Sequence, residues 1–218
     1  MGLPQSFEVV EYLSLVQKFI IDLENFQGPL SKQLWTNRGT RAWTHTVFVE
    51  CAKRLTGTTS IGLRRLDLTQ PQYKLSSLPG PGGVWHTVTT LDLEACTFKD
   101  IHELHIFVTS FQALSSLQME TIRLQSKNLL SFIPQGSRPL NSLRFWCEYD
   151  VMIPVVKWLV STGMVRHLVH LNWSHWKQGR WDDLIGGIEG SSLKELVFLA
   201  DYNWQGWSIC CSTCFCRC

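Results

Sequence analysis

The sequence predicts an α/β fold, with a curved parallel sheet and irregular helices on its convex face. The first observation is a phrase of three apolar residues, separated by two residues and then by one, that occurs six times. Its copies begin 25, 26, 26, 28 and 25 residues apart. The second observation is that stretches with helical spacing lie between the copies, and this alternation favours a parallel sheet. The copies are Leu63-Leu66-Leu68, Val88-Leu91-Leu93, Leu114-Leu117-Met119, Leu140-Leu143-Phe145, Leu168-Leu171-Trp173 and Leu193-Leu196-Phe198.

This phrase and this spacing are those of a leucine-rich repeat, which has a period of about 20–29 residues. We therefore expect a leucine-rich-repeat solenoid in which each copy forms one short strand. Because stacked repeats share one continuous core, residues 1–203 are predicted to form a single domain. Hydrophobic residues make up 44% of the chain, which is enough for such a core. Residues 204–218, rich in Cys and Trp, are predicted to be an unstructured tail.

Two elements are expected before the first of the six copies. Val16-Phe19-Ile21 has the same spacing of apolar residues and is predicted to be an earlier strand. Residues 42–55 are predicted to form a helix, because Val47, Cys51 and Leu55 share one stripe at helical spacing. Gly57 follows this stripe and would end the helix.

Residues 100–113 form the clearest predicted helix. Its apolar residues fall at positions i, i+3, i+7 and i+10, which is one face of a helix. Asp100 precedes the first of them and is a suitable N-cap, since its carboxylate can accept from free backbone N–H groups. The apolar residues are Ile101, Leu104, Val108 and Phe111.

Two further helices are expected nearer the carboxyl end. Residues 150–160 are the first, with Pro154 tolerated near the first turn and Gly163 at the end. Residues 181–188 are the second and weaker one, because each of its two adjacent glycines costs about 1 kcal/mol relative to Ala.

The residues between the apolar positions of each strand are expected to face the concave surface, since successive side chains of a strand point to opposite sides. We interpret this surface as a site for a protein partner, and Trp146 is its best single anchor because interface energy concentrates in Trp, Tyr and Arg. An extended partner with a basic segment beside an apolar residue would suit it. The alternative is that these are ordinary solvated strand residues. The predicted partner-binding residues are Asp67, Asp92, Glu94, Gln118, Glu120, Arg144, Trp146, His170 and Asn172.

Charge and hydropathy exclude several other classes of partner. The chain has 20 basic and 18 acidic residues without a basic run, so we expect no nucleic acid. The longest nearly uncharged run, residues 151–160, is too short to span a bilayer, so we expect no membrane. The amino end lacks the basic start of a secretory signal. The sequence therefore predicts an intracellular protein, cytoplasmic or nuclear, with Cys51, Cys96 and Cys147 as buried thiols.

No motif predicts catalysis, and we expect no enzyme activity, no cofactor and no metal. His102 and His105 stand three residues apart, one short of the zincin spacing, and are expected to face solvent.

Cys211-x-x-Cys214 with Cys216 and Cys218 could supply four thiolates to zinc. Other interpretations of this tail are palmitoylation, prenylation as in Rab-type GTPases, and a reading frame lost after about residue 203.

Three segments resemble the irregular leucine-rich repeats of F-box proteins. They are Leu63-Arg-Arg-Leu-Asp-Leu, Val88-Thr-Thr-Leu-Asp-Leu followed by Cys96 and Phe98, and Leu193-Lys-Glu-Leu-Val-Phe. With its Trp-rich copies the chain is similar to F-box-like proteins of basidiomycete fungi. The resemblance implies the substrate-binding part of a ubiquitin-ligase receptor.

The F-box itself, the helical module that binds the Skp adaptor, is not found in this sequence. A Skp-type adaptor is therefore expected as a partner only if an F-box lies outside this chain. The alternative is a truncated or self-associating repeat remnant that does not dock to a ligase.

Overall fold

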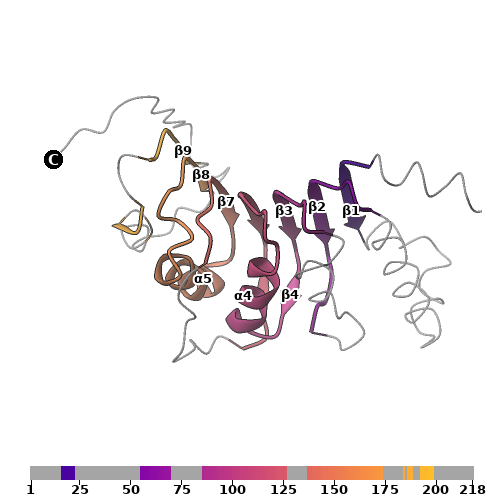
Figure 1. The fold of residues 1–218 in the computed structure, drawn as a ribbon. Coiled ribbons are helices and arrows are strands. Elements are labelled where there is room, and N and C mark those ends of the chain that lie inside the picture. The colour runs from indigo at the N-terminus through magenta and orange to yellow at the C-terminus, as the bar shows by residue number, and fades with distance from the viewer. Residues whose placement is uncertain are drawn as a thin grey trace, which may run out of the picture.

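The computed structural model describes residues 16–22, 55–69, 85–126, 137–173, 184, 186–188 and 192–198. Seven strands form one parallel sheet in the order β1-β2-β3-β5-β7-β8-β9 (Figure 1). The prediction of an α/β fold with a parallel sheet is therefore confirmed. The strands are β1 (Lys18–Asp22), β2 (Ser60–Arg64), β3 (Thr90–Glu94), β5 (Ser116–Glu120), β7 (Ser142–Trp146), β8 (His170–Trp173) and β9 (Glu195–Phe198).

Two helices and a second small sheet cover one side of this sheet. The helices are α4 (Ile101–Thr109) and α5 (Tyr149–Ser161), and the small sheet pairs β4 (Thr97–Phe98) with β6 (Arg123–Leu124). Figure 1 shows α4, α5 and β4 on the same side of the seven strands. Their apolar side chains join those of the strands in one buried cluster, so this side of the sheet is the core side.

The apolar residues of successive strands lie directly beside one another on the core side. Leu91 pairs with Leu117, Leu117 with Leu143 and Leu143 with Leu171, and each is at most 2% exposed. A fully buried Leu contributes roughly 1.5–3 kcal/mol. This row, repeated two residues later along each strand, is the centre of the core. The second row is Leu63, Leu93, Met119, Phe145 and Trp173.

The six junctions of the seven-stranded sheet begin with the same hydrogen-bond arrangement. The carbonyl of the residue just before one strand accepts from two consecutive backbone N–H groups of its neighbour, those of the residue before the neighbouring strand and of its first residue. The Thr89 carbonyl, for example, accepts from Ser115 and Ser116, both at 2.9 Å. The same arrangement fixes the same register at each junction between neighbouring strands. The accepting carbonyls are those of Gln17, Thr59, Thr89, Ser115, Asn141 and Val169.

The prediction for the first copy of the phrase is wrong by five residues. Strand β2 places Ile61 beside Leu91 and Leu63 beside Leu93, so the strand precedes the predicted phrase. Thr58 occupies the position in this copy that Val88 occupies in the next one. The Thr58 side chain is fully buried, and its hydroxyl donates to the Val16 carbonyl at 2.9 Å. A polar residue at this position concealed the true copy from a search for apolar residues.

The earlier strand predicted at Val16-Phe19-Ile21 is confirmed. Strand β1 pairs with β2 in parallel, with Phe19 beside Ile61 and Ile21 beside Leu63. The long interval before β2 therefore does not interrupt the sheet.

A left-handed residue ends three of the strands. Arg65, Ala95 and Thr121 have φ values of 59°, 51° and 50°, in the region that favours glycine. Each donates its N–H to the last carbonyl of the neighbouring strand, at 2.8, 2.8 and 2.7 Å. The chain then turns back toward the core.

After this turn, the next two apolar positions extend the core beyond the strands. The first of these positions is buried after all three turns, at Leu66, Cys96 and Ile122. Two residues later, Phe98 follows Cys96 and Leu124 follows Ile122, and both are buried as well. This turn therefore creates the small sheet that pairs β4 with β6.

The two predicted helices among the described residues are confirmed. Asp100 caps α4 by accepting from the Glu103 N–H at 2.9 Å. Helix α4 ends at Thr109, earlier than predicted, where the Ser110 hydroxyl donates to the Phe107 carbonyl at 2.5 Å. Helix α5 contains Pro154, and Gly163, with a φ of 73°, follows its end.

The prediction that His105 faces solvent is wrong. His105 is 7% exposed, and the Trp158 indole N–H of α5 donates to its Nδ1 at 2.9 Å. Position 105 lies four residues after Ile101 and three before Val108, so it belongs to the buried face of α4. His102 is exposed, as predicted.

Several predictions fall outside the described residues. They concern the helix over residues 42–55 apart from Leu55, Cys51, most of the helix over residues 181–188, and the tail over residues 204–218.

Replacing Thr121 with Gly should stabilise the protein. A β-branched residue in the left-handed region costs about 1–2 kcal/mol, while the added freedom of Gly in the unfolded chain costs about 0.4–1 kcal/mol. We expect Thr121→Gly to raise the free energy of unfolding in urea by about 0.5–1 kcal/mol. The control Thr90→Gly, inside β3, should lower it by a similar amount. Loss of stability in Thr121→Gly would contradict this account of the turn.

Candidate functional site

The side of the sheet opposite the core carries polar residues in continuous rows, which we call the polar face. In one row Asp92 lies beside Gln118, Gln118 beside Arg144, and Arg144 beside Asn172. In the next row Glu94 lies beside Glu120 and Glu120 beside Trp146. His170 lies one row earlier, beside Ser142. The structure thus brings together all of the predicted partner-binding residues except Asp67.

Asp67 is not on the polar face, and its prediction as part of this surface is wrong. It follows β2 and forms an isolated bridge with Thr97, at the edge of the small sheet. Its carboxylate accepts from the hydroxyl of Thr69 at 2.7 Å and from the Thr69 N–H at 3.2 Å. The five-residue error in the first copy is the cause, since it shifted Asp67 into a strand position.

Arg64 lies on the polar face, although the sequence analysis did not include it among the partner-binding residues. It lies beside Glu94 in the sheet, and its guanidinium contacts the carboxylates of Glu94 at 3.1 Å and Asp92 at 3.6 Å. Alignment of Ile61-x-Leu63 with Leu91-x-Leu93 was the signal that could have found it. The carboxylates of Asp92 and Glu94 are therefore paired with a positive charge on the polar face itself.

Gly62, next to Asp92 on β2, leaves this row without a side chain at that point. A Cβ atom there would lie 3.2 Å from Cγ1 of Ile20, so the Ile20 side chain occupies the space above the glycine. Ile20 is 42% exposed. On β2 and β1 the row of Asp92 is therefore continued by the apolar side chain of Ile20 rather than by a charged one.

Trp146 is the large aromatic side chain that the polar face leaves open to solvent. It ends β7 and is 43% exposed. Beside it, Glu120 forms an ion pair with Arg144 at 3.3 Å, and the Arg144 side chain is itself 48% exposed. Trp and Arg are among the residue types in which interface hot spots are enriched.

A second cross-strand pair lies toward the carboxyl end of the sheet. The His170 Nδ1 and the Glu195 carboxylate are 2.8 Å apart, and both side chains are more than half exposed. An exposed pair of this kind contributes little to stability. Asn172 lies two residues after His170 on β8 and beside Arg144 on β7. Its Oδ1 atom is buried without a hydrogen-bond partner among the described residues.

Burial and neighbouring charges shift the pKa of the Asp92 carboxyl on the polar face. Desolvation by burial raises the pKa of its carboxyl, and the nearby Glu94 carboxylate raises it further, against the opposing effect of Arg64. Its Oδ1 atom has no hydrogen-bond partner among the described residues. The ionised form of Asp92 is therefore less favourable here than in water.

The two described cysteines do not offer a nucleophile to this face. Burial raises the pKa of both the Cys96 and the Cys147 thiol to about 12, so both are protonated at neutral pH. Within the described ranges, no three His, Cys, Asp or Glu side chains come together as metal ligands. Neither described helix has the length and apolar character needed to cross a membrane.

Comparisons of the chain with protein-family models, with curated proteins and with solved structures give no match. The resemblance to F-box repeats is thus neither supported nor contradicted by them. What the polar face can bind follows from its own side chains.

The stability of the protein should depend on pH through Asp92. Because its pKa is raised in the folded state, the folded chain binds more protons than the unfolded chain as pH rises above about 4, the ordinary range of Asp. The ionisation of Asp92 therefore lowers the free energy of unfolding as pH rises through that interval. We expect the stability of Asp92→Asn relative to the unsubstituted protein to increase from pH 4 to neutral pH, measured by urea unfolding at each pH. A difference that stays constant or decreases would contradict this assignment.

Proposed function

We propose that the chain is a leucine-rich-repeat solenoid that recognises a protein partner through the polar face of its sheet. The solenoid assignment is supported by repeated phrases whose strands pair in one register along the sheet. The recognition assignment rests on one observation above the others. Trp146 is 43% exposed on a face built of polar rows, and it does not belong to the buried core cluster.

The side chains around Trp146 define the kind of partner that fits. Arg144 and Glu120 form an ion pair beside the ring, and the more exposed Arg144 can contact a polar or acidic group of the partner. Asp92 and Glu94 are already paired with Arg64, so their carboxylates attract a strongly basic partner less than unpaired carboxylates would. An extended segment with one apolar side chain over Trp146 and polar groups along the row of Gln118 suits the surface best.

The proposed role for such recognition is that of the substrate-binding part of an F-box-type receptor. Its support is the resemblance of the repeat phrases to those of F-box proteins. A strand-lined face that holds an extended segment is suited to this task, because it can select a substrate without chemistry of its own. The adaptor and ligase contacts would come from an F-box outside this chain.

Trp146→Ala should abolish the most important contact of the proposed interface. We expect proteins captured specifically by the chain from cells to be recovered at least about tenfold less well by this variant, since a hot-spot side chain is worth at least about 2 kcal/mol. Quantitative mass spectrometry of affinity-purified complexes is the measurement. The matched control is Ile106→Ala, because Ile106 is 44% exposed but lies on α4, on the core side. Equal recovery by all three proteins would show that the polar face is not the site.

The receptor role predicts a second, separate result. When the protein is expressed from its own locus with any additional coding sequence, a Skp-type adaptor and a cullin should copurify with it. Their recovery should be insensitive to Trp146→Ala, since the adaptor would contact another module. Recovery of chaperones alone, or of further copies of the chain, would instead favour the repeat remnant.

A further inference from the structure

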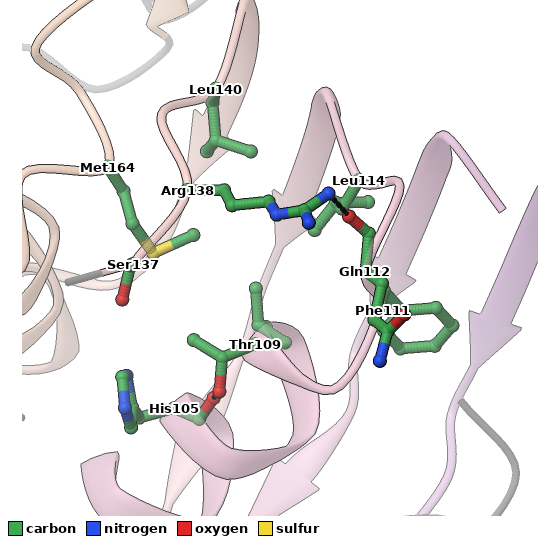
Figure 2. Close-up of a pocket in the computed structure, with 10 residues that line it drawn as sticks. His105, Thr109, Phe111, Gln112, Leu114, Ser137, Arg138, Leu140 and Met164 are labelled. Atoms are coloured by element: carbon green, nitrogen blue, oxygen red, sulfur yellow. Dashed lines mark hydrogen bonds between the residues drawn. The ribbon is translucent and has the colours of Figure 1, made fainter. Parts of the chain in front are cut away.

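A cavity of about 330 Å³ lies on the core side of the sheet, away from the polar face (Figure 2). It lies where α4 ends, between that end, the turn before β5 and the segment before β7. Phe111, Leu114 and Met164 give it an apolar wall. Its volume is within the range of about 300–1,000 Å³ that is typical of sites for small molecules.

One side of this cavity is formed by the imidazole of His105. Because its Nδ1 accepts from the Trp158 indole at 2.9 Å, the neutral ring carries its proton on Nε2. Burial lowers the pKa of His105, and the positive charge that His102 can carry lowers it further, so the neutral ring is favoured. The ring thus has one N–H group, at Nε2, for which no acceptor is found among the described residues.

The opposite side of the open space holds a positive charge. Figure 2 shows the Arg138 guanidinium reaching from the segment before β7 to the carbonyl of Gln112, to which it donates. Among the described residues that line the cavity, Arg138 carries the formal charge and no Asp or Glu stands with it. Ser137 adds a hydroxyl beside Met164. The formal charge of the described lining is therefore positive and lies on the exposed Arg138, beside the neutral polar side chains of Thr109, Gln112 and Ser137.

We propose that this cavity binds a small organic carboxylate with an apolar body. Arg138 binds the carboxylate, since a guanidinium matches its geometry with two parallel hydrogen bonds. Phe111, Leu114 and Met164 contact the apolar body, and the His105 N–H or the Ser137 hydroxyl donates to a further acceptor where the ligand has one. This site goes beyond the proposed protein recognition, because none of its residues lies on the polar face.

The test uses benzoate and hexanoate as probes, with benzamide and hexanamide as their uncharged counterparts. Binding to the purified chain is followed by calorimetry and by the NMR signal of the Trp158 indole N–H, assigned by its loss in Trp158→Phe. We expect at least one carboxylate to bind saturably and to shift this signal, and its amide to bind at least about tenfold more weakly.

Arg138→Gln should weaken carboxylate binding by at least about tenfold, and Arg123→Gln, an exposed arginine on β6 outside the cavity, should not change it. Ser137→Phe, which adds a ring to the lining, should abolish binding while leaving Arg138 in place. The proposal is overturned if neither carboxylate binds up to about 10 mM. It is also overturned if the amides bind equally well, or if Arg138→Gln and Arg123→Gln have the same effect.

Discussion

Each junction between neighbouring strands begins with one carbonyl that accepts two consecutive N–H groups, and the register it fixes governs the rest of the molecule. The Thr89, Ser115 and Asn141 carbonyls repeat this arrangement across the centre of the sheet. A slip of one residue at any junction would exchange the buried and exposed sides of that strand. The leucine rows of the core and the polar rows opposite them therefore depend on the same hydrogen bonds.

The polar face is a consequence of this register as much as the core is. Because charged residues recur at equivalent positions of neighbouring strands, each carboxylate is placed beside another repeat's side chain. Arg64 and Arg144 oppose the resulting repulsion between Asp92, Glu94 and Glu120. These ion pairs join side chains of neighbouring strands without a partner, and a preorganised surface loses less conformational entropy when it binds one. Trp146 remains accessible within it.

The two sides of the sheet differ in the environment that they offer to a ligand. The polar face is open and extended, which suits a polypeptide. The core side carries the partly open cavity near His105, which lies where α4 ends at Thr109 and the chain continues to the buried Phe111. Trp158, from the next helix, orients the His105 ring there. The proposed partner-binding face and the proposed carboxylate site share no residue.

The sequence by itself determined the parallel sheet, the helices after Asp100 and before Gly163, and the strand positions of Asp92, Gln118, Arg144 and Trp146. A repeated apolar pattern carries this information because each repeat must bury the same positions. The register of β2 was decided only by tertiary structure, because Thr58 is buried through a bond to Val16, and this placed Arg64 rather than Asp67 on the polar face. The roles of His105 and Arg138 were also decided there, since each depends on a residue distant in the sequence.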